Sequence, residues 1–241
     1  MYKKKRKPTV SFVIRTKNEG RFIGKVLRFV HQQTFEDFEV IIVDSGSTDR
    51  TLEKVKKYPV RLLEIKPEEF NFSYALNLGI KHSKGKFICI ISGHSIPISD
   101  TWLKDGMGNF KDKKVAAVTG HCTSFPIGYF NRNVGRMLFS PRVKTKNNTP
   151  WMTNSNSIIK KDLWKIYPFN EKLSGTEDYD WACEMLSRGY KIIKDKRFGV
   201  FHSHFLLGRP GHRKMSPIWK NWVKEIDKKK RPGESYTRLK I

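Results

Sequence analysis

The first 91 residues alternate between short apolar runs and helical patterns, and this alternation constrains the fold more than any other feature of the chain. The apolar runs have the length and continuous hydrophobicity of strands buried on both faces, and they cover 10–14, 40–43, 60–65 and 87–91. Helical spacing of apolar residues separates them, at 22–30, 52–56 and 73–82. Strand and helix in turn, repeated three times, predict an α/β fold whose parallel sheet carries helices on both faces.

The second half of the chain is less regular. An apolar run at 115–118 predicts another strand, and a helix is expected from about Glu177 to Arg188, ended by Gly189. Between His121 and Pro150, glycine, proline, asparagine and basic residues occur without periodicity, which predicts a long loop.

Three polar segments follow directly after predicted strands. They are Arg15–Glu19, Asp44–Asp49 and Ser92–Pro97. Ligands of open parallel sheets bind beyond the carboxyl ends of the strands, so these segments predict one composite site. The glycine-rich patterns of dinucleotide-binding folds and of P-loop ATPases are absent from these turns, which argues against both classes.

Four spaced motifs stand in a recognisable order. They are Val-Ile-Arg-Thr-Lys-Asn-Glu at 13–19, Val-Asp-Ser-Gly-Ser-Thr-Asp at 43–49, Ala-Leu-Asn-Leu-Gly at 75–79 and Gly-Thr-Glu-Asp at 175–178. The series resembles the inverting glycosyltransferases of family 2 over about residues 9–204. This resemblance implies the GT-A fold, a Rossmann-like, mostly parallel sheet flanked by helices, and the transfer of a sugar from a nucleotide-sugar donor to a hydroxyl acceptor.

The resemblance also implies a division of the chain. We expect a basic tail at 1–8, a GT-A domain at 9–204 with a nucleotide-binding half (9–97) and an acceptor and catalytic half (98–204), and a basic, aromatic, helical extension at 205–241. The implied donor is UDP-linked, and the implied acceptor is a surface glycan or a lipid-linked saccharide.

The residues that the resemblance assigns to the donor lie in the turns after the first, second and fourth strands and on the third helix. They are Thr16, Asn18, Glu19, Asp44, Ser45, Asn77, Ser92 and Gly93. Asp44 is expected to accept a hydrogen bond from a uracil N–H, although it could instead only cap its turn, the role expected of Asp49.

A histidine replaces the carboxylate that the family pattern has for its metal after the fourth strand. The stretch there reads Ser-Gly-His-Ser, with His94 at the expected aspartate position, and His202 and His204 are candidate further ligands. Imidazole binds divalent cations and favours Mn²⁺ over Mg²⁺, so the expected cofactor is one of these two ions. The alternative is a metal-free site in which basic side chains neutralise the diphosphate, with candidates Arg209, Arg213 and Lys214.

The resemblance assigns the catalytic carboxylates to Glu177 and Asp178, with Asp178 as the general base. An inverting displacement needs one carboxylate to take the proton of the acceptor hydroxyl. Both residues lie in the first turn of their predicted helix, where the macrodipole favours ionised carboxylates. The alternative is that they only cap this helix, and Asp180 is expected to be capping or solvated.

The net charge of +25 attracts anions, whether phosphorylated small molecules, an anionic membrane face or nucleic acid. Trp219, Trp222, Val223 and Ile226 have helical spacing among lysines, so this segment either binds an anionic membrane or packs onto the domain. No apolar run reaches the roughly 18 residues of a membrane span. We therefore expect a cytoplasmic protein, peripheral at the inner face of the membrane.

Two other functions compete with a transferase. A nucleic-acid-binding protein would fit the charge, but recognition motifs are missing, so nucleic acid is not an expected partner. A catalytically degenerate family member that only binds nucleotide sugars would fit the replacement at His94.

Three scattered cysteines (Cys89, Cys122 and Cys183) do not make a disulfide framework.

Overall fold

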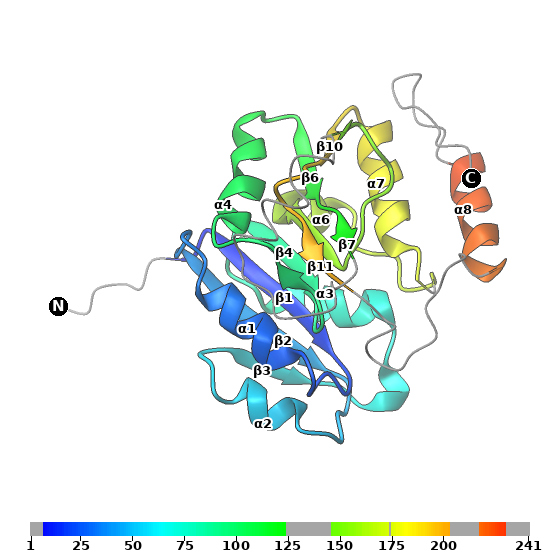
Figure 1. Ribbon diagram of the computed structural model, residues 1–241. Coiled ribbons are helices and arrows are strands. Elements are labelled where there is room, and N and C mark those ends of the chain that lie inside the picture. The colour runs from blue at the N-terminus through cyan, green and yellow to red at the C-terminus, as the bar shows by residue number, and fades with distance from the viewer. Residues whose placement is uncertain (1–6, 124–145, 174, 203–216, 230–241) are drawn as a thin grey trace.

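The structure, a computed structural model, describes residues 7–123, 146–173, 175–202 and 217–229 (Figure 1). Its centre is an eight-stranded sheet. The strands in spatial order are β3 (Arg61–Glu64), β2 (Phe38–Asp44), β1 (Val10–Thr16), β4 (Phe87–Ser92), β9 (Asn156–Lys160), β6 (Val115–Thr119), β10 (Lys191–Lys194) and β8 (Lys146–Asn147). β9 and β8 run antiparallel to their neighbours, and the remaining pairs are parallel.

The helices predicted between the first four strands are present. They are α1 (Ile23–His31), α2 (Thr51–Val55) and α3 (Phe72–His82), the last of which Asn71 caps by accepting hydrogen bonds from the backbone N–H groups of Ser73 and Tyr74. These elements confirm the predicted alternation of strand and helix and the mostly parallel sheet.

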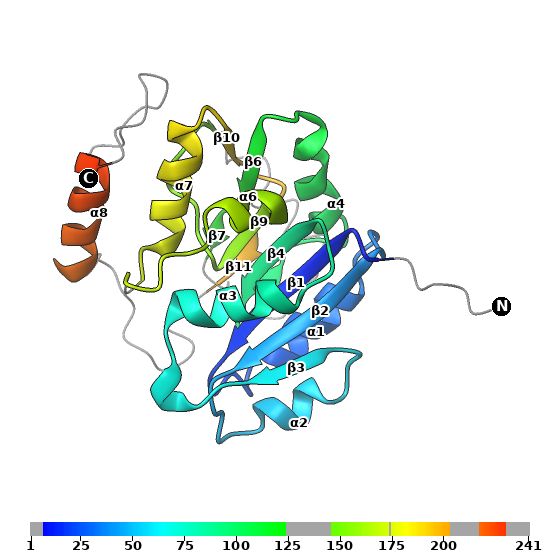
Figure 2. The same ribbon diagram turned by 180° about the vertical axis from the view of Figure 1, so that it is seen from behind.

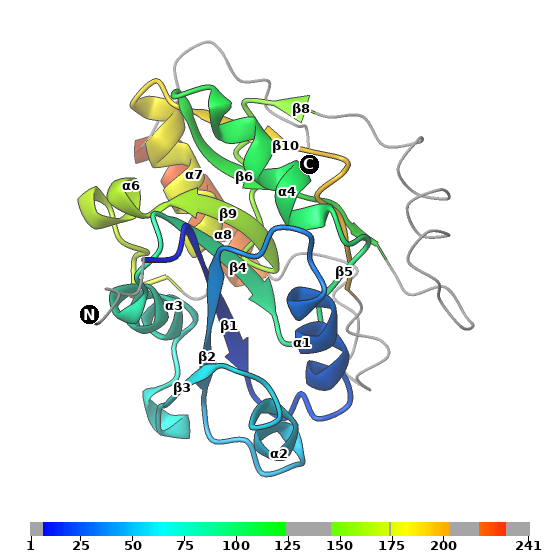
Figure 3. The ribbon, with the colours of Figure 1, turned by 90° about the vertical axis from the view of Figure 1, so that its left-hand side faces the viewer.

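Helices cover both faces of the sheet (Figures 2 and 3). α1 and α4 (Trp102–Met107) lie on one face, and α3, α6 (Lys161–Ile166) and α7 (Glu177–Ser187) lie on the other. Alternate residues of β2 serve the two cores: Val40 and Ile42 pack on the α1 side, whereas Ile41 and Val43 pack on the α3 side. A strand buried on both faces must be apolar throughout, which explains its continuous apolar sequence.

The helix α8 (Pro217–Lys229) lies outside α7 (Figure 1). Its buried residues Val223 and Ile226 pack against Tyr179, Cys183 and Leu173. The Tyr179 hydroxyl also donates a hydrogen bond of 2.9 Å to Asp227 of α8. The apolar side of this segment is therefore occupied by the domain, which is one of the two alternatives that the sequence left open.

Several elements were not predicted. A small second sheet joins β5 (Ile96–Pro97), β11 (Val200–Phe201) and β7 (Cys122–Thr123), and short 3₁₀ turns occur at Pro67–Glu69 and Gly108–Lys111. β9 also escaped the sequence analysis, although it lies in the middle of the main sheet. Of the long loop predicted at 121–150, residues 124–145 lie outside the described residues. None of the described helices has the length and hydrophobicity needed to cross a bilayer.

Candidate active site

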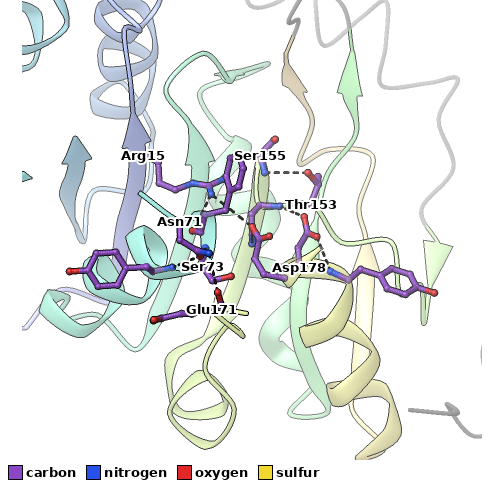
Figure 4. A network of polar contacts seen from close by, with 12 residues as sticks. Arg15, Asn71, Ser73, Thr153, Ser155, Glu171 and Asp178 are labelled. Carbon is purple, nitrogen blue, oxygen red and sulfur yellow. Dashed lines mark hydrogen bonds and ion pairs between the residues drawn. The ribbon is translucent and has the colours of Figure 1, made fainter. Parts of the chain in front are cut away.

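The ends of five elements meet at one edge of the main sheet. β1 and β4 end there, the antiparallel β9 begins there, and α3 and α7 present their amino ends to the same region (Figure 4). The backbone joins these ends directly, because the N–H of Ser92, the last residue of β4, donates to the carbonyl of Ser155 before β9. This edge holds most of the residues that the sequence assigned to the site.

Asp44 organises the turn after β2 from the inside. It is 1% exposed, and its carboxylate accepts hydrogen bonds from the Thr16 hydroxyl (2.6 Å) and from the backbone N–H and hydroxyl of Ser47 (2.8 and 2.6 Å). The neighbouring Ser45 donates from its backbone N–H and its hydroxyl to the Thr16 carbonyl. Asp44 and Thr16 thus lock the first two turns together.

The exposed Asn18 continues this junction. It adopts a positive φ of 54°, and its side-chain oxygen accepts a hydrogen bond of 2.8 Å from the backbone N–H of Thr48. Asp49 accepts hydrogen bonds from the backbone N–H groups of Gly20 and Thr51. Asp49 therefore stabilises the start of α2, as predicted from its position before the helix.

The turn after β4 is built around a buried contact between an imidazole and a carboxyl group. His94 and Glu19, each about 5% exposed, lie 3.0 Å apart between Nδ1 and Oε1. The His202 ring lies 4.6 Å from the His94 ring, and its Nδ1 bonds the Ser95 hydroxyl. Gly93 is required here, since a Cβ at this position would lie 2.8 Å from the Glu19 side chain.

This arrangement does not amount to a protein-built metal centre. Glu19 occupies the Nδ1 edge of His94, and the described residues include no group of three or more His, Cys, Asp or Glu that could hold a metal ion. The structure thus places two of the predicted metal residues side by side, while His204 and the basic residues Arg209, Arg213 and Lys214 lie outside the described part of the chain.

Asn154, in the segment before β9, donates hydrogen bonds to both Glu177 and Asp178. The backbone N–H of Asn154 donates to Asp178 Oδ2 (3.1 Å), and its side-chain amide donates to Glu177 Oε1 (3.2 Å). A second backbone N–H, that of Tyr179, donates to Asp178 Oδ1 (2.8 Å). Glu177 is almost fully buried, whereas Asp178 retains some exposure.

Arg15 brings a positive charge to this pair from the end of β1. Its Nη1 lies 3.9 Å from Glu177 Oε1 and donates to the carbonyl of Phe72, whose ring lies 4.9 Å from the guanidinium carbon. Burial and the charge of Glu177 raise the pKa of Asp178 to about 7, against the opposing hydrogen bonds and the charge of Arg15. A carboxyl with this pKa is ionised in part at neutral pH and can accept a proton.

Two predicted residues have other surroundings. The Asn77 side chain lies within α3 and tethers the segment after α6, donating to the Phe169 carbonyl and Glu171 and accepting from the Trp164 indole. Asp180 was expected to be solvated or capping, and the solvated alternative is wrong: Asp180 is 3% exposed and accepts a hydrogen bond from the Tyr167 hydroxyl.

Sequence reasoning missed Arg15 and Asn154 as individual site residues. Arg15 gave a signal, since a charged residue at the end of an apolar strand must have a polar destination. Asn154 gave none, because nothing in its local pattern marks the strand that follows it.

Comparisons with known proteins place this geometry in context. Residues 11–167, well over half of the chain, match glycosyl transferase family 2. The O-antigen chain rhamnosyltransferase WbaN of Salmonella anatum is 27% identical over 211 residues, which cover 82% of this chain and 67% of that protein. The chain spans between 63% and 66% of the length of three further curated relatives.

Solved structures share the fold. A mannosyltransferase of Pyrobaculum calidifontis in complex with GDP-Man and Mn²⁺ has a TM-score of 0.65 at 20% identity, covering 92% of this chain and 70% of that one. S. aureus TarS 1–349 in complex with UDP-GlcNAc has a TM-score of 0.63 at 17% identity, covering 96% of this chain and 68% of that one. These similarities confirm the predicted GT-A fold.

Proposed function

Because this chain belongs to glycosyl transferase family 2, we propose that it transfers a sugar from a nucleotide-sugar donor to a hydroxyl acceptor with inversion. The observation that carries this proposal is Asp178. It is a partly exposed carboxyl at the amino end of α7, fixed by two backbone N–H groups, with a pKa raised to about 7.

The proposed reaction is a single displacement. The acceptor oxygen forms a bond to the anomeric carbon while the bond from that carbon to the diphosphate breaks on the opposite face. The proton of the acceptor hydroxyl passes to Asp178, and the leaving diphosphate takes the bonding electron pair. A base whose pKa lies near the operating pH is ionised often enough to act and basic enough to take the proton.

We assign the nucleoside to the joined turns after β1 and β2. Asp44 and Thr16 shape this region from inside, Ser45 and Glu19 support it, and Asn18 is exposed beside it. Ser92 and Gly93, after β4, would lie beside the donor diphosphate. UDP is the proposed nucleotide, and the TarS complex supports it by analogy of fold, whereas the mannosyltransferase complex contains GDP-Man.

The described residues do not fit a protein-built metal site, so no step of this reaction is assigned to a metal ion. His94 would offer only one nitrogen, buried beside its partner Glu19. The mannosyltransferase complex contains Mn²⁺, which supports the use of a divalent cation by other proteins with this fold. In this chain, we propose that the main role of His94 is to fix the turn after β4 through its contact with Glu19.

The proposed acceptor is a saccharide on a surface glycan or on a lipid carrier. The name of the Salmonella relative, an O-antigen chain rhamnosyltransferase, supports this class. The side chains of Lys220, Lys224 and Lys228 are exposed on α8 and follow one another at helical spacing. These lysines support a peripheral position at an anionic cytoplasmic membrane face. Such binding would rely on charge, because the apolar side of α8 packs on α7.

The test is sugar transfer and donor hydrolysis by the purified chain with a panel of UDP-, GDP- and dTDP-sugars. Asp178→Asn should lower the rate by at least 100-fold, the scale on which a general base contributes, while nucleotide binding persists. Asp162→Asn, which removes an exposed carboxylate of α6, is the matched control and should keep the activity.

Equal loss in both variants would contradict Asp178 as the base. Nucleotide binding without turnover in the unsubstituted protein would instead favour the degenerate, binding-only alternative.

A further inference from the structure

Arg15 reaches the carboxylate pair from outside α7, with its Nη1 3.9 Å from Glu177 Oε1. It is the residue before the last one of the buried strand β1, and its guanidinium group is held from two sides, by the Phe72 carbonyl at 3.1 Å and by the Phe72 ring. Only 16% of its side chain is exposed. A guanidinium in such a position cannot swing freely into solvent, so its charge is fixed in space.

Glu177 is fixed as firmly on the other side. Its Oε1 receives the Asn154 amide at 3.2 Å and lies 3.9 Å from Arg15, while its Oε2 is buried without a hydrogen-bond partner among the described residues. A buried carboxylate that has one neutral donor is stabilised by a nearby cation, and Arg15 is that cation.

We propose that Arg15 is a positioning residue of the reaction: its fixed positive charge beside the carboxylate pair opposes the Glu177 carboxylate and so sets how readily Asp178 receives the acceptor's proton. The proposal rests on the proposed function for the reaction itself. The opposition of the Arg15 and Glu177 charges at Asp178, however, is a property of the protein without substrate, and it can be measured there.

The charged groups that act on Asp178 are of both signs. Across the described residues they are Glu177 in its own helix, which raises its pKa, and Arg15 from β1, which lowers it, while Asn154 and Tyr179 contribute backbone N–H groups. The nearby acidic groups of the other packed elements are engaged elsewhere: Asp227 of α8 with the Tyr179 hydroxyl, and Glu171 with Asn77 of α3.

The two charges predict opposite effects on one observable. Removing the cation with Arg15→Met leaves two carboxylates facing each other, so the titration midpoint of Asp178 should rise, by about one pH unit or more. Removing the neighbouring anion with Glu177→Gln should lower the midpoint by a similar amount. Arg15→Lys keeps a positive charge and should stay close to the unsubstituted protein.

The experiment is a carboxyl ¹³C NMR titration of the full chain without donor or acceptor, labelled at aspartate, with Asp178 identified through its loss in Asp178→Asn. The unsubstituted midpoint should be near 7. Arg28→Met, which removes an exposed arginine of α1, is the matched control for charge and should leave the midpoint unchanged. If Arg15→Met does not fold, Arg15→Gln replaces it, and Glu177→Gln tests the other sign independently.

Midpoints that stay unchanged in both Arg15→Met and Glu177→Gln, or that move in the same direction, would overturn the proposal. Opposite shifts in a protein that transfers no sugar would uphold the charge arrangement and reject the proposed function. In an active protein, the acidic limb of the kcat/KM profile against pH should move with the same signs.

Discussion

Single buried carboxylates in this chain behave differently according to the groups that surround them. Asp195 is fully buried, and burial alone would raise its pKa, but hydrogen bonds from Arg197 and Asn109 outweigh burial and lower it. Asp178 has Glu177 as a carboxylate neighbour, and the positive charge of Arg15 only partly offsets it. Burial therefore prevails, and the pKa of Asp178 rises to about 7. The surroundings, more than the depth of burial, separate the structural from the reactive carboxylate.

This difference predicts a pH-dependent stability that Asp178 contributes. The folded state holds the proton up to a pH of about 7, whereas the unfolded chain releases it near 4, so folding favours the protonated form. The contribution of Asp178 is thus present below pH 4 and declines as the pH rises to 7, with a slope of at most about 1.4 kcal/mol per pH unit.

Asp178→Asn should therefore gain stability relative to the unsubstituted protein between pH 5 and pH 8, as measured by urea unfolding at both values. Asp162→Asn, at an exposed position, should show no such gain. An identical difference in unfolding free energy at pH 5 and pH 8 would contradict the raised pKa.

At the scale of helices and strands, the sheet dictates which residues a helix can carry. Gly79 in α3 faces β1 and β2, where an added Cβ would lie 2.5 Å from Val13 and 3.1 Å from Val43. Gly24 in α1 has only an ordinary contact at 3.6 Å with Lys54. Substitution by alanine at these two glycines should therefore change stability in opposite directions.

Gly79→Ala should destabilise the protein by about 1–3 kcal/mol, because the helix must move away from the sheet. Gly24→Ala should stabilise it by about 0.5–1 kcal/mol, because alanine loses less backbone entropy in a helix. Chemical denaturation of both variants checks the signs. A neutral or stabilising Gly79→Ala would show that α3 does not approach β1 as closely as described.

The contact between α7 and α8 leads to a second prediction about elements. Ile226 is 5% exposed against α7, whereas Ile218 at the start of the same helix is 62% exposed. Ile226→Ala should cost about 2–4 kcal/mol through lost burial and the cavity left behind. Ile218→Ala should change stability by no more than about 0.5 kcal/mol. Thermal unfolding that gives equal effects for both would indicate that α8 leaves α7 in solution.

For the molecule as a whole, the net charge of +25 must be reconciled with a site that handles a diphosphate. A positive field concentrates anionic ligands near the protein, and it reduces the need for a bound cation to offset their charge. The buried His94–Glu19 pair points the same way, because the Nδ1 edge of the imidazole already faces a carboxylate.

We therefore expect UDP to raise the melting midpoint both in Mn²⁺ and in EDTA. Ligand at 100 times its Kd adds about 2.7 kcal/mol, and a chain of this size gains about 2–4 °C per kcal/mol, so the shift should be several degrees. GDP, dTDP and CMP in the same panel test the nucleotide. A shift that appears only with Mn²⁺ would contradict this expectation and return His94 to the metal, and His94→Ala should then remove it.

Local patterns in the amino-acid sequence are sufficient to predict the alternating first half, the parallel sheet and the turns at which the site would form. Each of these features is written in local periodicity: continuous apolar runs mark strands buried on both faces, and polar residues directly after them mark one sheet edge. Glu177 and Asp178 were located through a motif, and the structure places them at that edge with Arg15 from β1.

The remaining features depend on contacts between elements that are far apart in the chain. The strand β9 lies between β4 and β6 although its sequence, Asn-Ser-Ile-Ile-Lys, is short and bears no pattern of its own. The side of α8 that faces the domain depends on the apolar side chains of α7 against which it packs. The link from Arg15 through Glu177 to Asp178 joins residues far apart in the chain. Local pattern reports which face of an element is apolar, but the pKa of a carboxyl depends on the charges and the loss of water that only the assembled fold creates.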